Sequence, residues 1–305
     1  MKHVLKQAKD WVEAFRLRTL PLSFSLVITG TAVANQQGHL SAPILIMTLV
    51  TTLFLQVLSN LSNDYGDSEN GADNCDRVGP ARAVQSGAIT MRQMKTAVII
   101  FAILSFASGC ALLGLAYSEI GLAPVMTLLA VGIMCILAAI TYTAGKHPYG
   151  YIGLGDVSVF VFFGLVGVVG SYYLQAGEMC VGVWLPAASM GFMSCGVLNM
   201  NNMRDVENDK RAGKKTIPTK IGLKASSVYQ FALMSASVII MAFYAIHYGN
   251  IYQLISLFAA IPLVINAIRV RKSYRDTAFL DSQLKVISLS TLGISILFFL
   301  GSYAA

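Results

Sequence analysis

The chain has 305 residues, of which 55% are hydrophobic and only 12% are charged, and its formal net charge is +7. Soluble domains carry about 25% charged residues, so this composition excludes an ordinary soluble protein and indicates a chain embedded in lipid. The positive charge is confined to a few short segments, which argues against a nucleic-acid-binding surface, and no nucleic-acid partner is expected.

The chain begins with an amphipathic segment and continues with long apolar runs. Residues 5–18 (LKQAKDWVEAFRLR) predict a helix lying in the membrane interface. About 20 apolar residues are needed to cross a bilayer as a helix. On that basis we predict nine spans, at residues 20–36, 43–63, 96–117, 121–143, 157–176, 180–203, 226–246, 251–268 and 286–303.

These elements predict an all-α integral membrane protein with nine transmembrane helices. We expect a single domain over residues 1–305, with the interfacial helix at 1–18 and the membrane bundle at 20–303. Five glycines within the spans are expected to permit close helix packing, because they have no side chain. They are Gly109, Gly114, Gly164, Gly167 and Gly170.

The basic residues predict the orientation of the bundle. All 22 lysines and arginines fall in residues 1–18, 64–95, 146–156, 204–224 and 269–285, which lie on one side if the spans alternate. The positive-inside rule predicts that this side faces the cytoplasm. The N-terminus, the loop between spans two and three and the loop between spans six and seven all lie on this side. We expect a multi-pass protein of the bacterial cytoplasmic (inner) membrane, with its active site facing the cytoplasm.

Two acidic clusters occupy equivalent places in this topology. Span two ends in NLSNDYGD and span six ends in NMNNMRDVEND. Asn63 and Asp67 are four residues apart, as are Asn201 and Asp205, and Asp205 and Asp209, so each pair shares one face if the helix continues. Each span is the second of a four-helix unit, which suggests an internal repeat with a site at the repeat interface.

Carboxylates gathered at facing helix ends repel one another unless a cation lies between them. Asp and Asn oxygens are ligands that suit Mg²⁺ or Mn²⁺, and Mg²⁺ commonly bridges protein carboxylates and substrate phosphates. Basic residues suited to phosphate follow both clusters, including Arg82 after the first and Arg204 within the second. The pattern indicates a lipid substrate carrying a phosphate or diphosphate.

The motifs are similar to those of a known family. Asn63-Asp64-Tyr65-Gly66-Asp67 resembles the NDxxD signature of the UbiA superfamily of intramembrane prenyltransferases, and Asp205 to Asp209 resembles its DxxxD. The segments NDYGDSENGADNCDRVGPARAVQSGAIT, YTAGKHPYGYIGLGDVSVFVFFG and NNMRDVENDKRAGKKTIPTKIG resemble the branch that acts on 1,4-dihydroxy-2-naphthoate in menaquinone biosynthesis. The resemblance covers nearly the whole chain. One departure is Gly71, where many members have a further Asp, and we expect Asp73 or Asp76 to replace it.

The resemblance implies a reaction and its site. A polyprenyl diphosphate loses diphosphate, its allylic carbon bonds to a ring carbon of dihydroxynaphthoate, CO₂ leaves, and demethylmenaquinol results. Two Mg²⁺ ions, with Mn²⁺ as the alternative, are expected to bridge the diphosphate. The expected metal ligands are Asn63, Asp64, Asp67, Asp73, Asn201, Asp205 and Asp209. The expected diphosphate-binding residues are Arg77, Arg82, Lys146, Arg204, Lys210 and Lys214.

Four further residues are candidates for catalysis. Asp156 either acts on a naphthol hydroxyl or caps the N-terminus of span five. Lys146 matches a superfamily diphosphate contact, with a positive-inside anchor as the alternative. Tyr65 and Tyr142 are positioned to face a carbocation, and each also fits a packing role. Tyr149 and Phe162 share that ambiguity.

Other functions predict different features. Another branch of the superfamily would prenylate a different ring, such as 4-hydroxybenzoate. A CDP-alcohol phosphotransferase would show its acids in one compact DGxxAR-type pattern, which is absent. A secondary transporter would place its charged site near the bilayer midplane, whereas these acids stand at the ends of the spans. We expect membrane lipid and the two substrates as partners, and no obligate protein partner.

Overall fold

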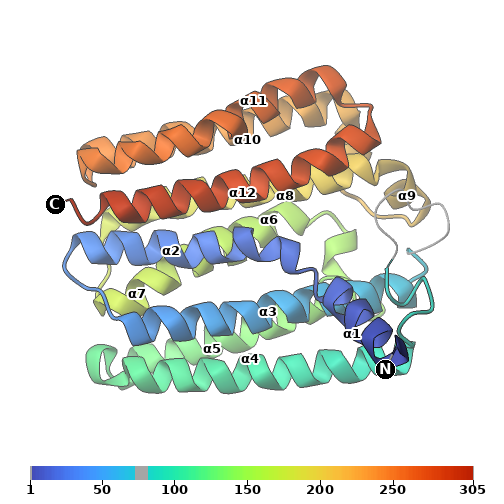
Figure 1. Ribbon diagram of the computed structural model, residues 1–305, viewed down its shortest axis with the longest axis horizontal. Helices are drawn as coiled ribbons and strands as arrows, with labels where there is room; N and C mark the ends of the chain where they lie inside the picture. Colours follow the sequence, from blue (N-terminus) through green and yellow to red (C-terminus); the bar gives the residue numbers. More distant parts are fainter. Residues whose placement is uncertain (1, 73–81, 305) are drawn as a thin grey trace.

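The computed structural model describes residues 2–72 and 82–304, and side chains from residue 6 onward (Figure 1). The described residues form helices joined by turns, without a β-strand. The first half contains α1 (Lys2–Phe15), the 3₁₀ turn η1 (Leu17–Thr19), α2 (Leu20–Gln36), α3 (Ala42–Glu69), α4 (Met91–Ile120) and α5 (Leu122–Thr141).

The second half begins with η2 (Tyr149–Tyr151) and an unusual fifth span. That span joins α6 (Gly155–Val159), a π-helix η3 (Phe160–Val169) and α7 (Gly170–Ala176). Next come η4 (Val181–Val183), α8 (Trp184–Arg204), α9 (Val206–Arg211), α10 (Ile217–His247), η5 (Ile251–Ser256), α11 (Leu257–Ser273) and α12 (Thr277–Gly301).

The prediction of nine spans is confirmed for the described residues, which contain nine helices long and apolar enough to cross a membrane. Several helices extend beyond the predicted spans. Helix α3 continues six residues past residue 63, to Glu69, and α12 begins at Thr277 rather than at residue 286. Hydropathy marks only the part of a helix that faces lipid, whereas backbone hydrogen bonding continues into the polar ends.

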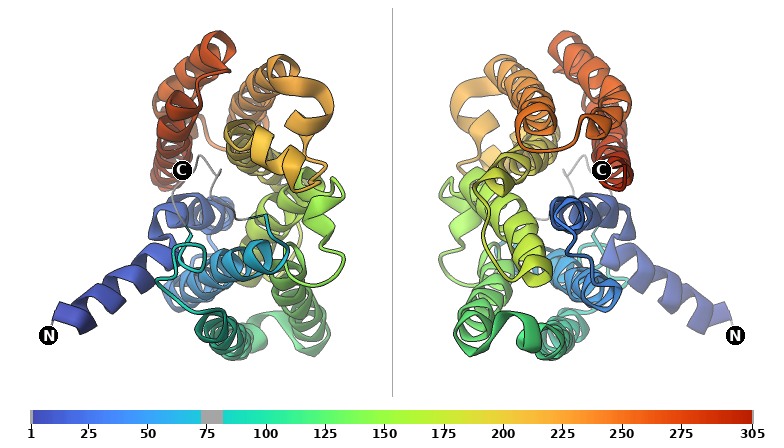
Figure 2. Two further views of the ribbon diagram at one scale, coloured as in Figure 1. Left: turned by 90° about the vertical axis from the view of Figure 1, so that its right-hand side faces the viewer. Right: turned by 90° about the vertical axis from the view of Figure 1, so that its left-hand side faces the viewer.

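Helix α2 lies inside the bundle, where it packs against α12, α7, α3 and η3. The largest buried cluster joins α8, α10, α11 and α12 to α2, and much of it consists of methionine side chains such as Met190 and Met234. A second cluster joins α3 and α4 to α1 through Ala14. Helix α1 itself projects from the side of the bundle (Figure 2).

The predicted role of the span glycines is confirmed at two positions. A Cβ atom on Gly164 would lie 2.7 Å from the Cα of Gly191, and one on Gly167 would lie 3.0 Å from Leu26 Cδ1, so helices cross closely there. The prediction is wrong for three others, where a Cβ atom would have no neighbour within 4 Å: Gly109, Gly114 and Gly170. The sequence shows that a residue is small but not what stands opposite it.

Candidate active site

The first acidic motif lies within the last turns of α3. The hydroxyl hydrogen of Thr143 is shared between two acceptors, since Oγ1 lies 3.1 Å from Asn63 Oδ1 and 3.0 Å from the carbonyl oxygen of Ser62. Gly66 makes this approach possible, because a Cβ atom there would lie 2.5 Å from the backbone nitrogen of Ala144. The segment after α5 is therefore held directly against the motif.

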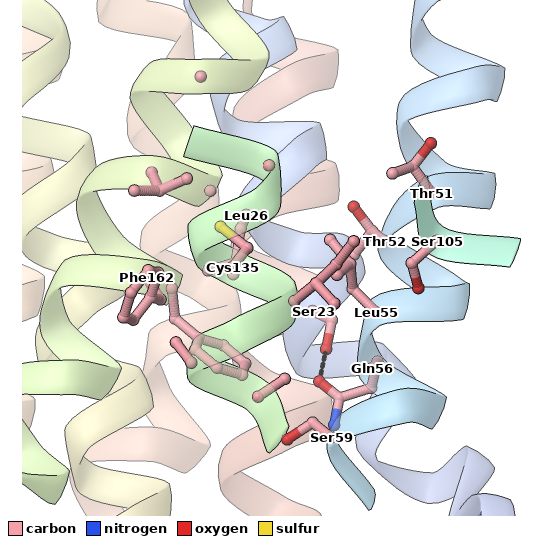
Figure 3. Close-up of a pocket in the computed structure, with 18 of the residues that line it drawn as sticks. Ser23, Leu26, Thr51, Thr52, Leu55, Gln56, Ser59, Ser105, Cys135 and Phe162 are labelled. Carbon is pink, nitrogen blue, oxygen red and sulfur yellow. Dashed lines mark hydrogen bonds between the residues drawn. The ribbon is translucent and has the colours of Figure 1, made fainter. Parts of the chain in front are cut away.

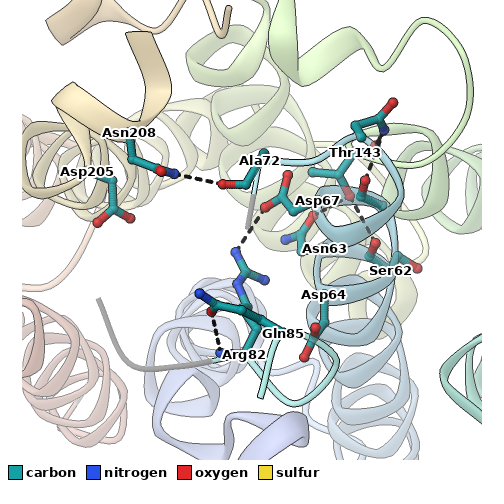
Figure 4. Close-up of polar contacts among 12 residues, drawn as sticks. Ser62, Asn63, Asp64, Asp67, Ala72, Arg82, Gln85, Thr143, Asp205 and Asn208 are labelled. Atoms are coloured by element: carbon teal, nitrogen blue, oxygen red, sulfur yellow. Dashed lines mark hydrogen bonds and ion pairs between the residues drawn. The ribbon is translucent and has the colours of Figure 1, made fainter. Parts of the chain in front are cut away.

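Asp67 has three partners from three different loops (Figure 4 shows the pair with Arg82). Arg82 Nη2 lies 3.0 Å from Oδ2, and Lys214 Nζ lies 2.8 Å from Oδ1. The hydroxyl of Tyr151 donates to Oδ1 at 2.7 Å, and Lys214 Nζ also lies 4.6 Å from the centre of the Tyr151 ring. Asp67 is almost fully buried, so these partners compensate for the loss of solvent around its charge.

Asp64 holds the loop that precedes α4. Its carboxylate accepts hydrogen bonds from the backbone N–H groups of Ala83 (3.0 Å) and Val84 (3.4 Å). The side chain is 1% exposed. Asp64 and Asp67 therefore anchor adjacent residues of the same loop, since Arg82 contacts one acid and its two successors contact the other.

The second motif lies across a break between two helices. Helix α8 ends at Arg204, and Asp205 separates it from α9. The Arg204 guanidinium forms a forked pair with Asp205, at 2.8 and 2.7 Å, and reaches Asp281 of α12 at 2.5 Å. Asp209 is buried at the end of the motif.

A hydrogen bond brings the two motifs together. Asn208 donates from Nδ2 to the carbonyl of Ala72 at 2.9 Å, immediately after the first motif (Figure 4). The N–H of Ala72 in turn bonds to the carbonyl of Asp67 at 2.8 Å. The motifs are thus neighbours at one end of the bundle, which we call the motif end.

The chemistry of these donors fits Mg²⁺, since both motifs bring Asp and Asn oxygens to the motif end. In the described part of the chain, however, no three His, Cys, Asp or Glu side chains stand close enough to share one ion. Asp64, Asp67 and Asp205 are directed instead at N–H groups and cations of the protein. The expected ligand Asp73 and the expected contact Arg77 lie outside the described residues.

Three predicted site residues are exposed or make their contacts with residues outside the acidic pairs described above. Lys146 is exposed. Lys210 is 51% exposed and pairs with Glu207 on its own helix at 2.9 Å. The hydroxyl of Tyr65 donates to Glu69 at 3.2 Å, and its ring packs in the cluster formed by α1, α3 and α4.

Asp156 occupies the first turn of α6. Its Oδ1 accepts a hydrogen bond from the hydroxyl of Tyr229 on α10 at 3.2 Å, and its carbonyl faces Cys195 Sγ at 3.3 Å. Both contacts are with the second half of the bundle. Asp156 is not among the residues that line the central cavity.

A cavity of about 420 Å³ extends from the motif end between α3, α4, α5 and the π-helix (Figure 3). Asn63, Tyr142 and Asn201 line it near the motifs, and Thr48 lines it farther along α3. These fifteen positions from Asn63 to Thr48 correspond to about 22 Å at 1.5 Å per residue. Most of the lining is apolar, as expected for a site that accepts a hydrocarbon chain.

Aromatic rings line the cavity near the motif end. Tyr142 and Tyr149 form an edge-to-face pair with ring centres 5.3 Å apart, and Phe162 also lines the cavity. Burial raises the pKa of the Tyr142 hydroxyl above its ordinary value, and nearby Tyr149 and Asp156 raise it further. Tyr142 therefore remains a neutral phenol at physiological pH.

The structure adds contacts that sequence spacing did not predict. Tyr151 and Thr143 donate hydrogen bonds to the first motif, and Asn208 joins the two motifs. Asp281 is a second carboxylate partner of Arg204, beside Asp205. Tyr151 lies in the segment YTAGKHPYGYIGLGD, whose resemblance to the family was the one sequence feature that could have indicated a functional role for this residue. Asp281 lies outside every motif, so only the packing of α12 against α8 shows its role.

Comparisons with known proteins give consistent results. A model of the UbiA prenyltransferase family matches residues 23–304. A 1,4-dihydroxy-2-naphthoate octaprenyltransferase of Escherichia coli is 40% identical, and the match covers 98% of this chain and 96% of that protein. The protein of the same name from Haemophilus influenzae is also 40% identical, with 98% and 97% covered.

Solved structures show the same fold. The apo structure of a UbiA homolog from Aeropyrum pernix has a TM-score of 0.68 at 18% identity, covering 95% of this chain and 98% of that one. A UbiA homolog from Archaeoglobus fulgidus, solved with DMAPP and Mg²⁺, has a TM-score of 0.62 at 18% identity and covers 94% and 97%.

Proposed function

This chain belongs to the UbiA prenyltransferase family, and we propose that it transfers a polyprenyl group from polyprenyl diphosphate to 1,4-dihydroxy-2-naphthoate. The acceptor is supported by the names of the two relatives that are 40% identical over nearly the whole chain. The nine apolar helices within residues 2–72 and 82–304 make the protein a multi-pass integral membrane protein. We further propose that it lies in the bacterial inner membrane, which its bacterial relatives support, and that the motif end faces the cytoplasm, which the distribution of Lys and Arg supports.

The observation that carries this proposal is the position of the paired motifs at the mouth of the apolar cavity. Asn63 and Asn201, one from each motif, line the cavity, and the acids one turn farther on stand outside it. A diphosphate at the motifs and a prenyl tail in the cavity would therefore be continuous. A transporter would need a charged site deep within the bundle, which this arrangement does not favour.

We propose that Mg²⁺ is held by the motif oxygens, namely those of Asn63, Asp64, Asp67, Asp73, Asn201, Asp205 and Asp209. The Mg²⁺ in the Archaeoglobus fulgidus homolog supports a metal of this kind. When bound, it would neutralise the negative charge that builds on the departing diphosphate. Asp67 and Asp205 would then exchange their present cationic partners for the metal.

Two cations are placed to follow that exchange. Arg82 and Lys214 both contact Asp67 and come from separate loops, so each can turn to a diphosphate oxygen without unfolding a helix. The guanidinium of Arg82 suits two phosphate oxygens at once, and the ammonium of Lys214 supplies a point charge. We propose these two as the principal protein contacts of the diphosphate, ahead of the exposed Lys146 and Lys210.

The allylic C–O bond breaks with its electron pair going to diphosphate, and the allylic cation bonds to the ring carbon that carries the carboxylate. The carboxylate leaves as CO₂, and its bonding pair restores the aromatic ring of demethylmenaquinol. Tyr142, Tyr149 and Phe162 line the cavity near the motifs, where their ring faces favour a cation and exclude water. Asp156 contacts Tyr229 of α10 and does not line the cavity, so we propose a supporting role for it.

The test is a prenyl-transfer assay with the purified chain in detergent. The reaction contains a short polyprenyl diphosphate, 1,4-dihydroxy-2-naphthoate and Mg²⁺, with EDTA and 4-hydroxybenzoate tubes in parallel. Metal-dependent prenylated naphthoquinol with release of CO₂ is expected. Product from 4-hydroxybenzoate alone would move the protein to another branch of the family, and intact diphosphate in every tube would overturn the proposed activity.

A further inference from the structure

A second cavity, which we call the α9 pocket, lies at the motif end but outside the site described above. It has a volume of about 360 Å³ and lies between α9, the beginning of α10 and the turn between α11 and α12 (Figure 1). No described residue lines both this pocket and the central cavity. Its size is in the range of cavities that hold small ligands, and the proposed prenyl transfer does not use it.

The pocket depends on an interruption of α10. Gly222 has φ 79° and ψ 162°, and glycine adopts such a positive φ readily whereas other residues avoid it. The interruption separates the short first stretch of α10 from the long helix that follows. Residues on both sides of it line the pocket, with Pro218 and Ile221 before the break and Leu223 and Lys224 after it. The break therefore forms one wall of the pocket.

The side chains that line the α9 pocket carry an excess of positive charge. The anion among them, Glu207, is paired with Lys210 at 2.9 Å. The two other cations, Lys224 and Arg275, form no ion pair within the described part of the chain. The pocket therefore holds two positive charges with which no described carboxylate is paired.

The surroundings of Arg275 hold it at the pocket without neutralising it. The central carbon of its guanidinium lies 5.6 Å from the centre of the Tyr274 ring, which also lines the pocket. The neighbouring Asp276 caps α12 instead, since its Oδ1 accepts a hydrogen bond from the N–H of Phe279 at 2.9 Å. An arginine placed against an aromatic ring keeps its N–H groups available for an anion.

Apolar side chains complete the pocket and relate it to the membrane surface. Val206 and Pro218 are buried, whereas Ile221 is 50% exposed. Lys224 is the last charged residue before residues 225–268, which contain no Asp, Glu, Lys or Arg. Lysine and arginine at the ends of spanning helices lie at the level of the lipid headgroups. The pocket therefore suits a ligand with an anionic head and an apolar body.

We propose that the α9 pocket binds the phosphate of an anionic phospholipid, such as phosphatidylglycerol. Arg275 suits two phosphate oxygens at once, and Lys224 supplies a point charge. Basic pockets between spanning helices on the cytoplasmic side bind anionic lipid headgroups. A zwitterionic lipid also has a phosphate, but its ammonium group would bring a further positive charge towards Lys224 and Arg275.

The pocket shares α9 with the second motif. Asn208 and Asp209 are buried, and Asn208 bonds to Ala72, whereas Glu207 and Lys210 of the same helix line the pocket. A phospholipid bound there would link α9 to α10 and to the turn between α11 and α12. The inference goes beyond the proposed function and involves neither substrate, so it can be tested without turnover.

The experiment measures lipid binding to the full chain in a neutral detergent, without substrates. Titration calorimetry compares phosphatidylglycerol with short acyl chains, phosphatidylcholine with the same chains, and inorganic phosphate. We expect the wild type to bind phosphatidylglycerol at one site, roughly tenfold more tightly than either other probe. Lys224→Gln and Arg275→Gln are each expected to raise the dissociation constant of phosphatidylglycerol about fivefold, and the double variant about 30-fold.

A matched control separates the pocket from the general positive charge of this face. Lys220→Gln combined with Lys272→Gln removes the same charge from two exposed lysines of α10 and α11 that do not line the pocket. We expect this control to bind phosphatidylglycerol as the wild type does. Both double variants are expected to keep the thermal unfolding midpoint of the lipid-free wild type, because all four side chains are exposed.

Three results would overturn the proposal. Equal affinity of the wild type for phosphatidylglycerol and phosphatidylcholine would remove the role of the net negative charge. Inorganic phosphate bound as tightly as phosphatidylglycerol would remove the assignment to a lipid. Equal weakening by the control pair would assign binding to diffuse surface charge instead of the pocket. Failure of the proposed function would appear only in the transfer assay, because no arm of this experiment contains a prenyl diphosphate or an aromatic acceptor.

Discussion

Removal of a single hydroxyl from Tyr151 tests whether the contacts of Asp67 prepare it for metal. Tyr151→Phe deletes the 2.7 Å hydrogen bond to Asp67 and keeps the ring under Lys214. A hydrogen bond to a charged group contributes about 1.5–3 kcal/mol. Groups that orient a metal ligand typically change metal affinity or activity about 10- to 100-fold when they are removed. We expect the Mg²⁺ concentration for half-maximal activity to rise within that range.

The assay titrates Mg²⁺ against prenyl transfer and, in parallel, against the thermal unfolding midpoint of the substrate-free protein. Weaker binding gives less stabilisation at each Mg²⁺ concentration, so the second curve reports affinity without turnover. Tyr149→Phe is the matched control in the same loop, because the hydroxyl of Tyr149 bonds to Ala138 and Ser158 instead of to Asp67. We expect its Mg²⁺ dependence to match the wild type.

Two results would refute this reasoning. Identical Mg²⁺ curves for Tyr151→Phe and the wild type would show that the hydroxyl does not position Asp67. Equal shifts in Tyr151→Phe and in the Tyr149→Phe control would assign the effect to general loosening of the loop.

Three other substitutions have definite expected outcomes. Gly66→Ala forces the segment after α5 away from the motif and should lower kcat at least tenfold; wild-type activity in this variant would contradict the close approach. The control Gly114→Ala adds a methyl group in open space, so it should leave the folding free energy unchanged or raise stability by up to about 1 kcal/mol. Asp281→Asn removes the negative charge from one partner of the buried Arg204. Because Asp281 is 40% exposed, we expect a fall in the unfolding midpoint on the order of 2 °C, and an unchanged midpoint would argue that the ion pair contributes nothing to stability. Gly132→Phe narrows the cavity and should lower activity with long polyprenyl diphosphates while sparing a five-carbon donor; equal activity with both would place the tail elsewhere.

The arrangement also explains why cations surround these acids. Without Arg82 and Lys214 the carboxylate of Asp67 would be buried and unpaired, which is strongly destabilising, and Arg204 pairs in the same way with Asp205. The same cations suit a diphosphate. One set of side chains can therefore stabilise the substrate-free bundle and then bind the substrate.

The sequence by itself determined the membrane class, the number of spans and the two motifs. Lipid provides no hydrogen-bond partners for the backbone, so each span must be a long apolar helix that can be recognised from local composition. The motif acids could be found for a related reason, since carboxylates at the end of an apolar helix are costly unless they have a function. Asp64, Asp67 and Asp205 follow from such local patterns.

The tertiary structure alone decided which side chains meet. Tyr151 and Asp281 reach the motifs from distant parts of the chain, and their sequence spacing carries no sign of this. The role of each glycine was undecided for the same reason, because a missing side chain gives either a close helix crossing, as at Gly164, or open space, as at Gly109. Local composition determines whether a segment enters the membrane, whereas function at the motif end depends on contacts that only packing creates.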